Sequence, residues 1–201
     1  MDNNEIYELL LNNTVYEILN ADYIFTQVFE QKKQALTLRN WVIGYFVDMY
    51  EQTLQRKYLF NDRKNILLAT QLHAEGLIYL NVEKLSIYKQ FFLRYPQFVQ
   101  LLPVNCPIEA IQWQENHISP LAHILLNKLS FEHLVVLSTI KTPIKRAFYE
   151  IEIIKNNWTV DELQWAISHF IFEQTGLEID DKEALLQSYI HKIHYDEADF
   201  S

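Results

Sequence analysis

The chain has 201 residues, a formal net charge of −9 and one cysteine. It is long enough for one sizeable domain, and its three glycines and five prolines are too few for the turns of many short strands. The single cysteine excludes an internal disulfide and a cysteine-based zinc cluster, and the negative charge argues against a protein that coats nucleic acid by bulk electrostatics. We therefore expect a mainly α-helical, soluble, cytoplasmic protein, because the start lacks a basic leader segment and no apolar run approaches roughly 18 residues.

Apolar spacing predicts a first helix over residues 4–20 and a long helix over 22–55. Gly44 lies inside the long helix, where a glycine costs about 1 kcal/mol relative to alanine. The close approach of another helix is the compensation that we expect at this position.

A helix over residues 63–75, a turn at Gly76 and a helix over 82–94 capped by Asn81 have the outline of a helix-turn-helix. The broken pattern of residues 103–120 allows a loop, a helical turn or a small β-hairpin, and a hairpin there would be the wing of a winged helix. We expect one domain over 1–201, with a helix-turn-helix-like portion over 31–120, a helical portion over 121–194 and a frayed tail over 195–201.

The carboxy-terminal portion begins with a short helix over residues 129–140, capped by Ser130. A helix then opens at Pro143 and runs to Asn156, and a second starts at a capping box formed by Thr159 and Glu162 and ends at Gly176. Val160, Leu163, Ile167 and Phe170 line one apolar face of this second helix. Trp165 and Phe172 fall on another face, which predicts burial on two sides. We expect this pair to be the hub on which the other helices pack, with a last helix over 180–194.

Basic residues are concentrated in residues 31–94, which hold ten basic and five acidic residues, a balance of +5, whereas the remainder carries −14. Such asymmetry is typical of a surface that faces a polyanion or of a fold that complements its own charges. The residue types that reach phosphates and base edges give the candidate DNA-binding set. It consists of Lys84, Lys89, Gln90, Arg94, Arg56, Lys57, Arg63 and Lys64. The alternative is a solvated face on an ordinary helical hairpin.

Sequence blocks spread over residues 20–180 resemble, in order, the YhcG-like family. They are LTLRNWVIGYFV at 36–47 with Glu51 and Gln52, LSFEHL at 129–134, KRAFYEIE at 145–152, and NWTV at 157–160 with Glu162 and Leu163. Gly76, Phe91, Tyr95 and Pro96 fit the intervening helix-turn-helix of that family.

The resemblance implies an amino-terminal winged helix-turn-helix-type domain of poorly defined function, which in full-length members precedes a PD-(D/E)XK nuclease domain and is presumed to engage DNA. This chain leaves no room for a nuclease core after Tyr195. Where the family tends to have arginines after its tryptophan-serine turn, this chain has Asp161, Gln164, Trp165 and Gln174. These departures point to a partner-binding or regulatory derivative, or to a separated domain.

Catalytic and metal-binding patterns are weak. His191 and His194, with Asp196, Glu197 and His169 as further ligands, could share an ion, but solvated histidines explain them equally well. Cys106 could pair with His117 or His123 as nucleophile and base, but no oxyanion-binding sequence accompanies it. Glu150 and Glu152 point to different helix faces, and we expect exposed contacts between Glu150 and Lys145 or Arg146. Dispersed glycines make no phosphate loop, and the aromatic residues are expected in the core.

Two functions remain, neither of them enzymatic, and neither needs a cofactor, a metal, a small-molecule substrate or a membrane. The first is a DNA-binding or nuclease-associated accessory domain that contacts DNA through the basic helix-turn-helix segment. The second is a protein–protein interaction or self-association module that has lost DNA binding. Basic residues that share one surface would favour DNA, and basic residues that are dispersed or paired with acids would favour the module.

Overall fold

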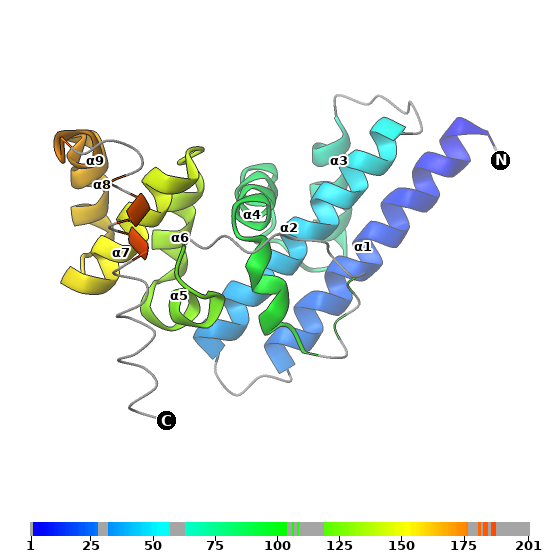
Figure 1. The fold of residues 1–201 in the computed structure, drawn as a ribbon. Helices are drawn as coiled ribbons and strands as arrows, with labels where there is room; N and C mark the ends of the chain where they lie inside the picture. The colour runs from blue at the N-terminus through cyan, green and yellow to red at the C-terminus, as the bar shows by residue number, and fades with distance from the viewer. Residues whose placement is uncertain are drawn as a thin grey trace. The chain divides into compact units, whose positions relative to one another are not determined.

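A computed structural model describes residues 2–27, 32–56, 63–103, 106, 108, 119–176, 181, 183, 184, 186 and 187. The chain divides into two compact units, Met1–Ile111 and Gln112–Ser201. The described residues form helices and turns, with no strand among them, so the expectation of a mainly α-helical fold is confirmed (Figure 1). The division between the units lies inside residues 103–120, and a single domain over the whole chain stays a prediction.

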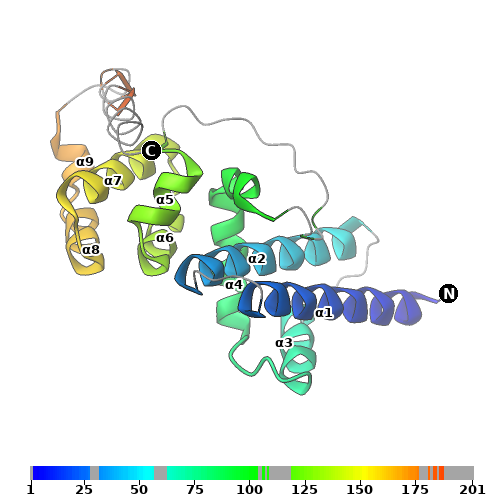
Figure 2. The same ribbon diagram turned by 90° about the horizontal axis from the view of Figure 1, so that it is seen from below.

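Unit 1 begins with two antiparallel helices of equal length, α1 (Asn3–Gln27) and α2 (Lys32–Arg56), which lie side by side (Figures 1 and 2). The expected boundary near Asn20 is wrong, because α1 continues for two further turns. Ala21, Ile24 and Phe25 are buried in those turns, and no glycine or proline interrupts them. Burial of this apolar face outweighs the weak local stop signal at Asn20.

The centre of unit 1 is the contact of α2 with α4 (Val82–Arg94). A Cβ added at Gly44 would lie 2.0 Å from the backbone oxygen of Tyr88, so only glycine allows the two backbones to approach this closely. The indole Nε1 of the fully buried Trp41 donates a hydrogen bond of 2.8 Å to the carbonyl oxygen of Tyr95. The close helix approach expected at Gly44 is therefore found.

The helix-turn-helix segment comprises α3 (Lys64–Ala74), a turn and α4. Gly76 has a φ of 97°, in the range that favours glycine, and the side chain of Asn81 accepts a 2.8 Å hydrogen bond from the Lys84 amide. The 3₁₀ helix η1 (Pro96–Leu101) follows α4. Most of the expected wing lies outside the described residues, so the winged form stays a prediction.

Unit 2 contains α5 (Ala122–Lys128), α6 (Phe131–Ser138), α7 (Pro143–Asn156), α8 (Val160–Ser168) and α9 (Ile171–Gln174). The expected caps are present. Ser130 caps α6, and Thr159 and Glu162 form the capping box of α8. Pro143 occupies the first turn of α7. These local signals are readable from sequence because each involves residues only three positions apart.

Two expectations for unit 2 need correction. The helix that starts at Thr159 does not reach Gly176, because α8 ends at Ser168 and Phe170 takes a left-handed conformation before α9. In addition, α7 and α8 pack with α6 and α9, whereas the helices of unit 1 pack around α2. The expected hub is thus the centre of unit 2, and unit 1 has its own centre at α2. Most of the predicted last helix, 180–194, and the whole tail lie outside the described residues.

We predict that Gly44→Ala lowers the free energy of unfolding of the chain by about 3 kcal/mol, because the new methyl group forces the backbones of α2 and α4 apart. Chemical denaturation followed by circular dichroism measures the change. Ser86→Ala, on the exposed side of α4, is the control and should stay within about 0.5 kcal/mol of the parent. A neutral Gly44→Ala would mean that the two helices do not touch at this point.

Candidate interaction surfaces

The basic residues of α4 do not form one stripe. Successive residues of an α-helix turn by about 100°, which separates Lys84 from Lys89, and Lys89 from Arg94, by about 140°. Lys84 is exposed, with its Nζ atom 5.8 Å from the centre of the Tyr79 ring. Lys89 is half-buried and turns toward α2, where its Nζ lies 3.1 Å from Glu51 and 3.9 Å from Asp48.

Lys64 and Lys89 meet at one carboxylate. The Nζ of Lys64 lies 3.3 Å from Oε2 of Glu51, the oxygen that Lys89 also approaches, and Asn65 donates a 3.1 Å hydrogen bond to the other oxygen. Burial acts to raise the pKa of Glu51, but the hydrogen bonds from Asn65 and Lys89 and the charges of Lys89 and Lys64 outweigh it, so this pKa lies below the ordinary 4.5. Two of the predicted DNA contacts are thus held by an acid of the same unit.

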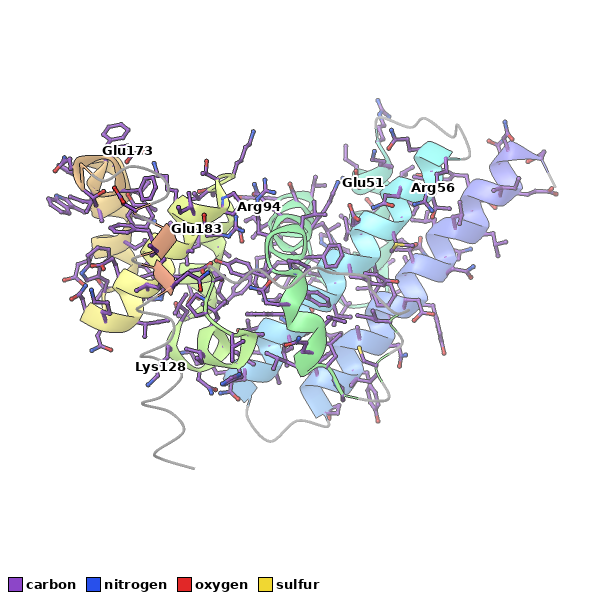
Figure 3. The ribbon with its side chains drawn as sticks, viewed as in Figure 1. Glu51, Arg56, Arg94, Lys128, Glu173 and Glu183 are labelled. Atoms are coloured by element: carbon purple, nitrogen blue, oxygen red, sulfur yellow. The ribbon has the colours of Figure 1, made fainter. Side chains whose placement is uncertain are left out.

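The other predicted contact residues come from α2, α4 and the start of α3. Gln90 and Arg94 are half-buried on α4, and Arg63 is exposed before α3. Arg56, at the end of α2, donates a 3.0 Å hydrogen bond to Gln52 one turn earlier. Figure 3 labels Arg56 on α2 and Arg94 on α4. Lys57 lies outside the described residues. The structure therefore brings together Lys64 and Lys89 at Glu51, while Lys84, Lys89 and Arg94 point to different sides of α4.

A second acidic residue, Asp22, also forms an ion pair with a basic residue of unit 1, Arg39. The Nη1 of Arg39 lies 3.1 Å from Oδ1 of Asp22, which also accepts a 2.6 Å hydrogen bond from the Tyr79 hydroxyl. The guanidinium of Arg39 lies over the Tyr79 ring at 4.8 Å. Together with the Glu51 cluster, this pair shows the internal charge complementarity that the sequence left open as an alternative.

Unit 2 exposes a group of aromatic rings at the end of α8. Trp165 is 57% exposed and Phe170 is 61% exposed, and the ring of His169 stacks on Trp165 with centroids 4.3 Å apart. We call Trp165, His169 and Phe170 the aromatic surface. Sequence spacing placed Phe170 on the inner face of a continuous helix, and the break before α9 is what turns it outward.

The backbone at this surface is strained. Phe170 has a φ of 55°, a conformation that costs a bulky residue on the order of 1–2 kcal/mol. Tyr149, which is fully buried on α7, spans the break, because its hydroxyl donates to the Ala166 carbonyl at 3.3 Å and accepts from the Phe172 amide at 3.4 Å. Gln174 adds a 2.6 Å hydrogen bond to the carbonyl of His169. The surroundings therefore hold Phe170 in place at a conformational cost.

Acidic residues lie close to the aromatic surface in sequence and in space. Asp161, Glu162 and Glu173 are exposed on α8 and α9. Lys145 forms a 2.6 Å ion pair with Glu173, and its Nζ lies 6.0 Å from the Phe170 ring centre. This arrangement gives an apolar centre with a mainly acidic border.

The metal and nucleophile patterns of the sequence fall partly outside the described residues. The described residues hold no group of three or more potential metal ligands, and His191, His194, Asp196 and Glu197 lie outside them. Burial, together with the charge of Glu17, raises the pKa of the Cys106 thiol to about 11, so the thiol stays protonated near neutral pH. Of its two suggested partners, His123 is exposed, and His117 falls outside the described residues.

Glu150 is fully buried, which corrects the expectation of an exposed contact. Its Oε1 lies 3.7 Å from Nε of the buried Arg146, and its Oε2 accepts a 2.5 Å hydrogen bond from Ser119. The expected i, i+4 pairing of Glu150 with Arg146 is present, but it stabilises the interior of unit 2.

Protein-family models, curated proteins and solved structures contain no match to this chain. The resemblance to the YhcG-like family therefore stays a prediction. No helix in the described part of the chain is long and apolar enough to cross a bilayer.

We predict that Glu51→Gln lowers the free energy of unfolding by about 1 kcal/mol at pH 7. The folded-state pKa of Glu51 is depressed, so its stabilising effect is complete above pH 4.5 and disappears as the pH falls through the folded-state value. Denaturation series between roughly pH 3 and 7 measure this window. Glu83→Gln, on the exposed side of α4, is the control, and an equal loss at both ends of the pH range for Glu51→Gln would contradict the ion-pair explanation.

Proposed function

We propose that this chain is a non-catalytic protein-interaction module that binds its partner through the aromatic surface. The observation that carries the proposal is Phe170, a large apolar side chain held in a strained conformation and still 61% exposed. Strain of this kind is kept where the surroundings enforce it, and it is common at ligand-binding positions. Aromatic residues are also the commonest anchors of protein interfaces.

The chemistry of the surface indicates a basic and apolar partner segment. Trp165 offers a ring face on which an arginine or lysine side chain can lie. Asp161, exposed one turn before Trp165, can attract positive charge toward the rings, whereas Glu162 caps α8 and Glu173 is paired with Lys145. The YhcG-like resemblance suggests a nuclease-type assembly as the source of such a partner.

DNA binding is the second candidate. It is favoured by Arg56, Arg63 and Lys84, which are exposed in unit 1, and by the family resemblance. It is disfavoured by the pairing of Lys64 and Lys89 with Glu51 and by the spread of the α4 bases around the helix. DNA binding gains strength when several Lys and Arg side chains on one surface neutralise phosphates together and release the counterions of the DNA.

We predict that Phe170→Gly abolishes partner binding while the free energy of unfolding stays unchanged or rises by up to about 1 kcal/mol, because glycine relieves the left-handed strain. The tagged full chain, Phe170→Gly and Trp165→Ala are compared by quantitative affinity purification and then by titration with the purified partner. Ile78→Ala removes a comparably exposed apolar side chain from unit 1 and serves as the control. A partner retained by both unit 2 variants would refute the aromatic surface as the binding site.

We predict no saturable binding of labelled duplex or branched DNA in fluorescence anisotropy at roughly 50 mM salt, where electrostatic attraction is strong. Binding that weakens steeply toward roughly 200 mM salt would instead establish the DNA function. In that case the triple variant Arg56→Glu, Arg63→Glu and Lys84→Glu should lose binding, whereas Lys141→Glu in unit 2 should keep it.

A further inference from the structure

The outer side of α1 carries a regular apolar seam. Leu9, Tyr16 and Tyr23 are 48%, 67% and 64% exposed, and each lies seven residues from the next. Seven residues is close to two helical turns, so the three side chains lie on one stripe of the helix. We call these three residues the α1 seam.

The seam lies opposite the side of α1 that packs within unit 1. Ile18 and Phe25, which are two and nine residues beyond Tyr16, point about 160–180° away from it and are buried. The positions between the seam residues on the same side of the helix are uncharged: Asn12, Asn13, Leu19 and Asn20. A second helix can therefore pack against this side of α1 without the desolvation of many charged groups.

The seam is complementary to itself in one orientation. Leu9 and Tyr23 are placed symmetrically, seven residues on either side of Tyr16. In an antiparallel pair of α1 helices related by a twofold axis at Tyr16, Leu9 of one copy faces the partner's Tyr23, and the two Tyr16 side chains meet at the axis. A twofold interface requires this kind of self-complementarity.

The charges favour the same orientation. α1 contains four acidic residues and no basic one, with Glu5 and Glu8 near its amino end. At its other end α2 begins, and Lys33 is exposed there. An antiparallel pair keeps Glu5 and Glu8 of the two copies at opposite ends of the interface, whereas a parallel pair sets these acidic residues against each other.

From the spacing, the exposure and the charges we propose that the chain forms a homodimer by antiparallel packing of α1 on α1 through Leu9, Tyr16 and Tyr23. The interface uses unit 1 only, so it does not rest on the aromatic surface of unit 2. A chain that dimerises through unit 1 presents two aromatic surfaces to its partner and gains avidity from both.

We predict that sedimentation velocity of the full chain shows a monomer–dimer equilibrium at micromolar concentrations, and that Tyr16→Asp weakens dimerisation at least about 10-fold, because it sets two carboxylates at the axis. Circular dichroism should show unchanged helix content, since Tyr16 is exposed. Phe170→Asp, at an exposed aromatic of unit 2, should dimerise like the parent. A chain that stays monomeric at roughly 100 μM, or a dimer lost in Phe170→Asp and kept in Tyr16→Asp, would overturn the proposal.

Disulfide trapping tests the orientation. In a Cys106→Ser background, a mixture of Leu9→Cys and Tyr23→Cys chains should form a cross-linked dimer under mild oxidation, and neither variant alone should do so. Cross-linking of Leu9→Cys with itself would indicate a parallel pair and would refute the proposed arrangement. Because this readout is a covalent dimer of the chain alone, it is independent of whether the aromatic surface binds a partner.

Discussion

The contact of α2 with α4 is the constraint on which unit 1 depends. It exists because Gly44 has no side chain where Tyr88 approaches, and the Trp41 indole fixes the end of α4 through the Tyr95 carbonyl. Arg39 adds the bond to Asp22 that ties α2 to α1. Gly44, Trp41 and Arg39 belong to the block at 36–47 that resembles the YhcG-like family, so this stretch has a packing role. A resemblance carried by such residues bears on the fold more directly than on the function.

Charge pairing explains why a basic segment need not be a DNA-binding surface. Glu51 lies where α2, α3 and α4 meet and attracts both Lys64 and Lys89, and Asp22 holds Arg39 in the same way. A basic side chain in such a pair must break its contact with the acid before it can bind a phosphate. The free energy lost with the pair offsets much of the free energy gained from the phosphate. Glu51 is already counted in the local balance of +5 in residues 31–94, and Asp22, which lies outside that range, offsets one further positive charge within unit 1.

In unit 2 the decisive feature is the break between α8 and α9. Tyr149 bridges the break from α7, and Phe170 is held outward beside Trp165 and His169. Pre-organisation of this kind lowers the ordering cost of binding, because the rings are already fixed before a partner arrives. Together with the α1 seam, it suggests an adaptor in which one unit self-associates and the other recognises a partner. Both surfaces rely on aromatic residues set apart from the buried core.

The sequence by itself determined the helical class and most local features of the fold: the caps at Asn81, Ser130 and Thr159, the turn at Gly76 and the helices over 63–75, 82–94 and 143–156. These depend on residues a few positions apart, so a linear pattern contains them. Only the tertiary structure decided that α1 continues past Asn20, that Lys89 turns toward Glu51, that Glu150 is buried and that Phe170 faces outward. Each of these outcomes depends on a residue distant in sequence, such as Asp48, Ser119 or Tyr149. Long-range contacts of this kind override local helix preference, and the spacing of residues along the sequence does not reveal them.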